Sequence, residues 1–573
     1  RPEATASQRR EEISVRLLSL ELIGQYKGLA DQTFDLSGAS SSILAFIGLN
    51  GSGKSQLMEL IAEILAYVER RQRKDFRVRS KPAYKFEIVF ERAPTAHVQW
   101  SGEKFCVRLG AGAALQVTRS KRVEAGVEPF SALASHWEQA EPCDLADLPL
   151  PRLVGYASGL NENLQRPFMR NAVQYFDVMN IRARRIKELA QRNVDQNRVA
   201  AINRKYRTRH PGIFGLHSDA DDADPLRTTE SDTPLPAAVF LDYDCTNLVV
   251  AALGLLPTDE RDRLWPEVRF RHPARVTLRY DLRDAPAAQD SIQDLRQLVR
   301  AVGQPGVRGL AGRTTDDQFE VFELDYLYAE VTLDFTNVEM MARLNVTYVD
   351  PATLFWKLYK LQLLGVKRWT PEVRSSLKDD AFVGHVKKPL KGRLPLTVVD
   401  LLLSDGLRTV AIDDLSDGES QLLHTVGAVR LFGSSDCLFL FDEPETHLNP
   451  SWRTRFHLDM QQAIGEQFTS QMLLSSHSPF LISSLHREAV FHFERIDGST
   501  GMAPTATETF GASFEVLIKK HFGLRSAISQ TAVDAIRERL EGDPQDNASK
   551  RQWLEDTLGE SMERAYLLKR LGG

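Results

Sequence analysis

The segment GLNGSGKS, Gly48–Ser55, constrains the fold more than any other part of the chain. It fits the pattern G-x-x-x-x-G-K-S/T, follows the apolar run SSILAFIG, and opens a stretch with apolar residues at helical spacing. The glycines permit a tight turn whose backbone N–H groups point at phosphate oxygens, and the helix N-terminus adds partial positive charge. The segment therefore predicts a strand, a phosphate-binding loop and a helix, as found in α/β folds.

The same pattern assigns a role to each polar residue of the loop. Lys54 would place its positive charge near the β- and γ-phosphates, and Ser55 would offer its hydroxyl to Mg²⁺. We therefore expect ATP and Mg²⁺ as the cofactors. The other loop residues expected to surround ATP are Asn50, Gly51, Ser52 and Gly53.

A second motif, CLFLFDEPETHLNP at 437–450, is an apolar strand that ends in two acids, Asp442 and Glu443. Adjacent carboxylates at the end of a buried strand repel each other and are costly to desolvate without a cation. Asp442 is suited to hold Mg²⁺ through water, and Glu443 to polarise the attacking water. The alternative is a surface turn made by Asp-Glu-Pro, which does not explain the unbroken apolar run before the acids.

Two further motifs complete a family pattern. The sequence LSDGE, Leu415–Glu419, precedes a helix-like stretch, and SSHSPFLISS places His477 after the apolar run QMLLS. The order and spacing of these motifs resemble the ABC superfamily of ATPases. DEPETHLNP, SSHSPF and the gap of 360 residues from Ser55 to Leu415 are similar to its soluble branch, which contains OLD, RecF and SMC-like ATPases. With the late TFGASF segment, the chain most resembles ATPase subunits of bacterial anti-phage systems of the Septu and retron-associated type.

The resemblance implies an ATPase in which two copies pair head to tail around ATP. In the family, the signature acts on the ATP of the other protomer, a loop asparagine links the two sites, and a histidine senses the γ-phosphate. Asp417 stands where a second glycine is usual and adds negative charge beside ATP, which implies slow or conditional hydrolysis. Carried onto this chain, the signature residues are Ser416, Asp417, Gly418 and Glu419, the D-loop residue is Asn449, and the switch histidine is His477.

Two assignments around the nucleotide stay open. In the segment LVGYASGLNENLQ, either Gln165 or Asn161 takes the place of the family's Q-loop glutamine. Tyr26 is a candidate for stacking on adenine, with core packing as the alternative.

The motifs lie at both ends of the 573-residue chain, which predicts a divided ATPase domain. The expected fold is an α/β ABC-type domain, a mixed sheet with helices, split by a large α+β or helical insertion. The expected parts are residues 13–165 with the phosphate loop, 166–399 as an inserted arm or lid, 400–510 with the signature, acidic strand and histidine, and 511–573 as a helical tail.

Charge distribution bears on partners. The net charge is −5, but residues 70–81 carry seven basic residues and residues 182–209 carry ten. These stretches predict contact with DNA or RNA, with a solvated helix face as the alternative. The 96 residues after His477 contain no Asp-x-Asp pair, so the expected effector is a separate nuclease. The amphipathic tail around Phe514 either docks that partner or packs on its own domain.

The remaining features concern location and competing functions. No run of about 18 apolar residues occurs, and the four cysteines are widely spaced, so a cytoplasmic protein without a membrane partner is expected. A DNA repair or maintenance ATPase of the RecF or SMC-like kind is the alternative function. The energy subunit of a membrane transporter fits less well, because the long charged insertion is not what such subunits carry.

Overall fold

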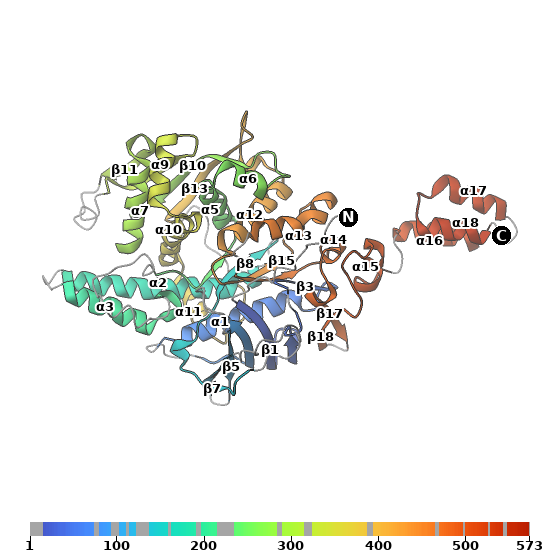
Figure 1. Cartoon of the computed structure of the whole chain (residues 1–573), viewed down its shortest axis with the longest axis horizontal. Helices are drawn as coiled ribbons and strands as arrows, with labels where there is room; N and C mark the ends of the chain where they lie inside the picture. The colour runs from blue at the N-terminus through green and yellow to red at the C-terminus, as the bar shows by residue number, and fades with distance from the viewer. Residues whose placement is uncertain are drawn as a thin grey trace, which may run out of the picture.

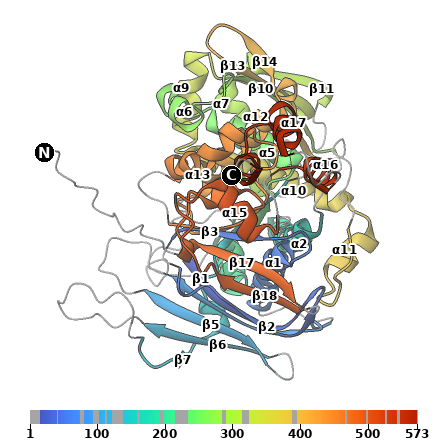
Figure 2. The same cartoon turned by 90° about the vertical axis from the view of Figure 1, so that its right-hand side faces the viewer.

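The structure is a computed structural model, and its elements form three sheets with helices around them (Figures 1 and 2). It describes residues 15–39, 41–73, 80–92, 102–110, 114–121, 137–158, 162–190, 196–214, 234–283, 289–313, 324–386, 394–464, 469–496, 499–524, 528–541 and 547–571.

A seven-stranded sheet in the order β18-β17-β3-β16-β15-β8-β9 forms the centre. All neighbours pair in parallel except β17 and β18. Strands β3, β15 and β16 are buried at every position, as expected for parallel strands covered on both faces. The bounds are β3 Ile43–Gly48, β8 Arg152–Ala157, β9 Ala238–Phe240, β15 Cys437–Asp442, β16 Gln471–Ser475, β17 Val490–Ile496 and β18 Ser499–Pro504.

Helices cover both faces of this sheet (Figure 1). Helix α1 (Lys54–Arg71) and helix α2 (Glu162–Ala190) pack against each other on one face, and α12 (Asp417–Phe432) and α13 (Pro450–Ile464) lie on the other. The predicted strand, loop and helix around residues 43–71 and the predicted strand before Asp442 are confirmed. The α/β fold predicted from the sequence is therefore present.

A six-stranded antiparallel sheet in the order β2-β1-β4-β5-β6-β7 lies beyond α1. Helix α1 is buried between this sheet and the central one, and Tyr67 meets the ring of Phe86 on β4 edge-on at 6.3 Å. The bounds are β1 Val15–Tyr26, β2 Leu29–Asp35, β4 Lys85–Arg92, β5 Glu103–Leu109, β6 Leu115–Lys121 and β7 Glu141–Pro142.

The third sheet has five antiparallel strands in the order β11-β12-β10-β13-β14, with helices α5, α7, α9 and α10 around it (Figure 1). Strand β10 alternates buried Val276 and Leu278 with outward Arg275 and Thr277, as a one-sided antiparallel sheet requires. The bounds are β10 His272–Asp281, β11 Val307–Arg313, β12 Tyr326–Asp334, β13 Leu396–Ser404, β14 Thr409–Ala411, α5 Tyr243–Leu253, α7 Gln289–Val302, α9 Val338–Thr347 and α10 Pro351–Leu363.

The sheets do not follow the expected domain boundaries. Strand β9, within the expected insertion 166–399, forms the edge of the central sheet, and strand β13 crosses position 399/400. The reason is hydrogen bonding: β9 completes the open edge of β8, and β13 pairs with β10 along nearly its whole length. The division into domains itself stays a proposal.

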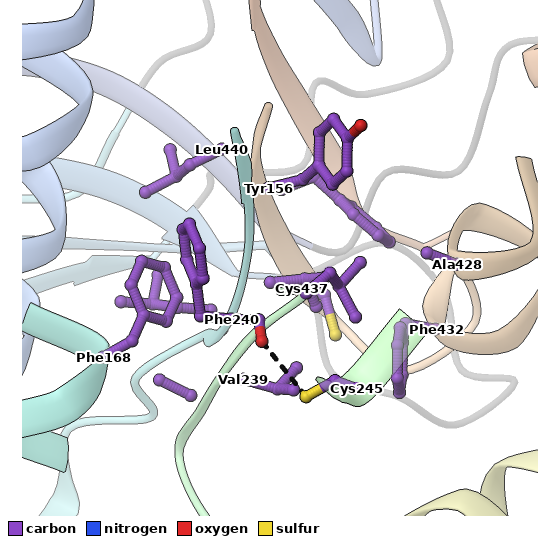
Figure 3. Close-up of a cluster of buried hydrophobic side chains, with 14 of the residues drawn as sticks. Tyr156, Phe168, Val239, Phe240, Cys245, Ala428, Phe432, Cys437 and Leu440 are labelled. Carbon is purple, nitrogen blue, oxygen red and sulfur yellow. Dashed lines mark hydrogen bonds between the residues drawn. The ribbon is translucent and has the colours of Figure 1, made fainter. Parts of the chain in front are cut away.

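A buried cluster around β9 joins helices α2, α5 and α12 to the central sheet (Figure 3). Phe168 of α2 lies 5.3 Å from Phe240 of β9, ring centre to ring centre. The thiol of Cys245 donates to the carbonyl oxygen of Phe240 at 3.3 Å. These contacts tie α2 and α5 to β9 at the edge of the central sheet.

Charged residues are also buried between α1 and α2. Arg166 lies 2.7 Å from Glu59 and 2.8 Å from Glu63, and its guanidinium donates to the hydroxyl of Tyr26 at 2.9 Å. Tyr26 is buried among these groups, so the structure supports its core alternative and not stacking on adenine.

The C-terminal residues form helices, as predicted, and α16–α18 lie apart from the rest of the molecule in Figure 1. Helix α15 packs against α14: the rings of Phe514 and Phe480 are 4.5 Å apart, and Leu517 is buried. Within the described ranges, no helix combines the length and apolar character that crossing a lipid bilayer requires. The other helices are α3 Gln196–Arg209, α4 Pro211–Phe214, α6 Thr258–Leu264, α11 Pro371–Leu377, α14 Pro479–Ile482, α15 Phe514–His521, α16 Gln530–Glu541, α17 Asn547–Thr557 and α18 Met562–Leu571.

Candidate functional site

The loop after β3 has a backbone that only glycine adopts easily. Gly48, Gly51 and Gly53 have φ angles of 140°, 78° and 108°. A Cβ on Gly48 would lie 2.2 Å from the carbonyl oxygen of Phe493 on β17, so a larger residue would push the two strands apart. The glycines of the motif therefore set the path of the loop, with Asn50 and Ser52 between them.

Lys54 begins α1 and points back over the loop. Its ammonium donates to the carbonyl oxygens of Gly48 at 2.9 Å and Leu49 at 3.2 Å. Burial lowers the pKa of Lys54 to about 8, although Glu443 and Asp442 oppose that shift. The cation is thus held at the loop, next to two carboxylates of the acidic strand end.

Ser55 and Asp442 meet where β3 and β15 end. The hydroxyl of Ser55 donates to Oδ1 of Asp442 at 2.9 Å, and the hydroxyl of Ser475 at the end of β16 donates to the same oxygen. Parallel strands bring their carboxyl ends to one edge of the sheet, which explains how residues so distant in sequence converge. A hydroxyl and a carboxylate are hard oxygen ligands, so this pair fits Mg²⁺.

Glu443 follows directly and faces His477. Oε1 of Glu443 lies 3.2 Å from Nε2 of His477, and the hydrogen bond from His477 holds the pKa of Glu443 below its ordinary value, against the effect of burial. The backbone of Glu443 is left-handed, with φ 51°, and its N–H donates to the hydroxyl of Ser475 at 3.1 Å. This arrangement keeps Glu443 ionised and aimed beside Asp442.

The signature segment caps α12. The hydroxyl of Ser416 accepts the N–H of Glu419 at 3.3 Å, and Oε2 of Glu419 accepts the N–H of Ser416 at 3.0 Å, which is a capping box. The hydroxyl of Ser416 also donates to Oε2 of Glu419 at 2.7 Å. Ser416 and Asp417 are exposed. Gly418 is buried, and a Cβ there would lie 2.9 Å from the carbonyl oxygen of His447.

Contacts link this helix to the loop after the acidic strand. The amide of Gln421 donates to the hydroxyl of Tyr156 at 3.2 Å, and its oxygen accepts the N–H of His447 at 2.9 Å. Asn449, predicted as the D-loop residue, is exposed and accepts the N–H of Trp452 at 2.9 Å at the start of α13.

Gln165 lies on the first turn of α2, and its amide donates to Oδ2 of Asp242 at 2.9 Å. Asn161 lies outside the described residues. The N–H of Ser158, directly after β8, donates to the carbonyl oxygen of Asp442 at 2.9 Å. The segment between β8 and Gln165 therefore begins beside Asp442, whereas the Gln165 side chain is hydrogen-bonded to Asp242.

Three polar residues around the site were not predicted from the sequence: Ser475, Ser476 and Glu445. Their signal was present in SSHS and DEPE, where polar residues come soon after the apolar runs MLL and CLFLF. Such residues must find partners at the strand ends, because unpaired buried polar groups are costly. The structure pairs Ser475 with Asp442, and Ser476 with Glu445.

Fold and site together define a P-loop ATPase domain: a parallel sheet, a phosphate loop, and an acidic strand end beside the loop's serine. A protein-family model described as "AAA domain, putative AbiEii toxin, Type IV TA system" matches residues 312–483. That match includes the signature, the acidic strand and His477, and leaves out the phosphate loop.

Two solved structures are similar to the chain. One is the Smc head domain with an extended coiled coil bound to the C-terminal domain of ScpA, from Pyrococcus furiosus, with 12% identity, 89% of this chain and 100% of that chain covered, and a TM-score of 0.28. The other is SmcHead bound to the C-winged helix domain of ScpA, with 10% identity, 86% and 97% coverage, and a TM-score of 0.29. At these TM-scores, neither likeness bears on fold or function. No curated protein matches the sequence.

Proposed function

We propose that the chain hydrolyses ATP as an ABC-type ATPase, pairs head to tail with a second copy around ATP, and gates a separate effector. The observation that carries the ATPase role is the convergence of Ser55, Asp442 and Glu443 beside Lys54 at one edge of the central sheet. Head-to-tail pairing is supported by the exposed Ser416, for which the described residues offer no hydrogen bond to the phosphate loop.

In this proposal the chain's own residues divide the work. The loop N–H groups and Lys54 bind the phosphates, and Glu443 accepts the proton of the attacking water. His477 holds Glu443 by the 3.2 Å contact and exchanges it for the γ-phosphate. Ser55 and Asp442 would hold Mg²⁺, which supplies positive charge to the phosphates when bound.

The proposed effector is a nuclease encoded separately, acting in bacterial anti-phage defence. The motif pattern described above supports the defence role, as does the family model named for a toxin of a Type IV TA system, while the separate nuclease rests on the motif pattern alone. A RecF- or SMC-like ATPase for DNA maintenance is the second candidate, and the P-loop domain is equally compatible with it. Isolation of the native complex separates the two, because only the first requires a stably bound nuclease.

Nucleic acid is the proposed target, and α2 with α3 is the part that supports it. Arg184 and Arg185 of α2 and Arg204 and Lys205 of α3 are exposed on two helices that pack together (Figure 1). The stretch 70–81 gives weaker support for nucleic-acid contact, because its Arg70 is buried in an ion pair with Asp380.

Charge reversal tests the nucleic-acid contact. We expect Arg204→Glu with Lys205→Glu to weaken binding of duplex DNA or RNA roughly tenfold and to flatten its salt dependence, because phosphate contacts release counterions. Reversal of Arg537, exposed on α16, is the control. Equal binding by both variants in a filter assay would remove this part of the proposal.

A mixing experiment tests the composite site. Lys54→Ala disables the phosphate loop of one protomer, and Ser416→Ala disables the signature of the other. Each variant alone should be inactive. A one-to-one mixture should recover about a quarter of wild-type ATPase activity, because about half of the dimers are mixed and each holds one intact site. If the mixture stays inactive while wild-type protein hydrolyses ATP, head-to-tail pairing is wrong.

A further inference from the structure

Glu445 is a buried acid to which the proposed mechanism gives no role. Only 3% of its surface is exposed, and the described residues include no cation in an ion pair with it. Oε1 accepts the hydroxyl of Ser476, and Oε2 makes no hydrogen bond within the part of the chain that the structure describes. A buried acid without an ion-pair partner is expected to destabilise the fold unless it contributes to function.

The neighbours of Glu445 indicate which function it serves. Glu445 lies two residues after Glu443, on the turn that ends β15, and Ser476 lies directly before His477, on the loop that ends β16. The N–H of Ser478 donates to the hydroxyl of Ser476 at 2.9 Å. The Ser476 hydroxyl is therefore held both by Glu445 and by the residue that follows His477. The two loops carry Glu443 and His477, whose side chains meet at 3.2 Å.

We propose that Glu445 is a positioning residue, which through its hydrogen bond with Ser476 holds His477 in register with Glu443 for ATP hydrolysis. This inference rests on the proposed ATPase function. Ser475 secures the start of the same turn by accepting the N–H of Glu443, and Ser476 secures its far side. Loss of the Ser476 bond frees the His477 loop, and displacement of a catalytic contact by about 1 Å commonly costs up to about a hundredfold in rate.

The charge state of Glu445 fits this role. Burial raises the pKa of Glu445 to about 7, against the hydrogen bond from Ser476, so below that pH the side chain is a neutral acid. The groups that face it are Glu443 on the same turn, Arg453 of α13 and Tyr156 of β8. Above pH 7 the ionised carboxylate lies beside Glu443, and the two negative charges repel each other.

Two substitutions separate the hydrogen bond from the mere filling of space. Glu445→Gln keeps a neutral acceptor of the same shape, and Glu445→Met keeps the shape without an acceptor. At saturating ATP and pH 7, we expect kcat of the Gln variant within about threefold of wild type, and kcat of the Met variant lowered by about tenfold or more with KM little changed. Asp459→Asn is the matched control, because Asp459 is also a buried acid with its pKa raised to about 6, on α13.

The dependence of kcat on pH gives a second test, because loss of a residue with a purely structural role would leave that dependence unchanged. Wild-type kcat should fall as the pH rises through 7, because Glu445 then ionises. The Glu445→Gln variant should lose that dependence, while the Asp459→Asn control keeps it.

Wild-type kcat in the Met variant, or equal loss in the Gln and Met variants, would overturn the inference. Should the Met variant fail to fold, Ser476→Ala decides, with the same fall in kcat expected and wild-type kcat contradicting it. A wild-type protein without ATPase activity would instead refute the proposed function itself.

Discussion

Three side chains predicted to touch ATP already have partners inside the chain. Lys54 donates to loop carbonyls, the hydroxyl of Ser416 donates to Glu419, and the amide of Gln165 donates to Asp242. Each contact satisfies a polar group that would otherwise lack a partner in the absence of nucleotide. ATP binding must therefore exchange hydrogen bonds at these positions, and its net gain is the difference between the old and the new bonds.

The pKa of Lys54 makes ATP binding depend on pH. Burial places that pKa at about 8, so the ammonium loses its proton as the pH rises above 8, whereas phosphate binding requires the charged form. We expect the Kd for ATP to increase roughly tenfold for each pH unit above 8, with proton uptake on binding. Calorimetry in two buffers of different ionisation enthalpy measures both effects. Lys54→Arg, which stays charged, serves as the control, and a Kd equal at pH 7 and pH 9 would contradict the prediction.

Glu419 competes with phosphate for Ser416. Its carboxylate accepts both the hydroxyl and the N–H of Ser416, and it places negative charge at the N-terminus that should face the γ-phosphate. Glu419→Gln keeps the cap and removes the charge, so ATP should drive dimerisation at an ATP concentration roughly two- to fivefold lower. Light scattering across an ATP titration measures this, with Glu555→Gln on α17 as the control. An unchanged midpoint would show that the charge plays no part.

At the scale of elements, α1 connects the phosphate loop to the rest of the molecule. It lies between two sheets, and its buried acids Glu59 and Glu63 are paired with Arg166 of α2. Arg170 of α2 reaches Glu63 at 3.3 Å and Asp380 at 3.6 Å. The helix after the phosphate loop and the helix after β8 are thus joined by buried ion pairs.

Removal of Arg166 should therefore be costly. Arg166→Met removes the cation that Glu59 and Glu63 share and leaves each acid with one other partner, Lys27 and Arg170. Because breaking a buried pair completely costs about 3–5 kcal/mol, the loss here should not exceed that range. We expect a marked fall in the urea midpoint of unfolding. Arg263→Met is the control, because Arg263 pairs with Asp259 at the surface, where a pair contributes about 0–1 kcal/mol. Equal midpoints for the two variants would show that the buried cluster does not stabilise the fold.

At the scale of the whole molecule, the ATPase sheet is built from both ends of the chain, with the five-stranded sheet between them in sequence. In the proposed dimer, substitution of Glu443 should still allow ATP to close the dimer but should prevent the hydrolysis that opens it. Glu443→Gln should bind ATP with little change in Kd, lose hydrolysis by about a hundredfold or more, and accumulate as a dimer. Size-exclusion chromatography with and without ATP measures this, and hydrolysis at the wild-type rate would refute the role given to Glu443.

The parts of the fold that could be predicted are those encoded by a contiguous stretch of sequence. The loop at Gly48–Ser55, helix α1 and strand β15 each follow from contiguous patterns, and the structure confirms them. Strand β9 was missed because three residues carry no periodicity, and only the open edge of β8 makes them a strand.

The contacts around the acids depend on the tertiary structure. Glu445 and Ser476 are 31 residues apart, and only the parallel pairing of β15 with β16 brings them together. The Arg166 cluster was missed for the same reason, since its acids lie about a hundred residues earlier on another helix. Charges of this kind look like solvent-exposed residues until the packing of the helices is known.

The position of β3 between β16 and β17 has a consequence for how the protein is made. Both neighbours of β3 come from residues after 470, so a growing chain on the ribosome carries an apolar strand without its partners until residues 471–496 have been translated. Exposed strand edges of this kind are prone to aggregate. Premature termination before residue 471 would therefore yield a product that can neither close this sheet nor bring the acidic strand beside the nucleotide loop, and we expect such fragments to depend on chaperones or be degraded.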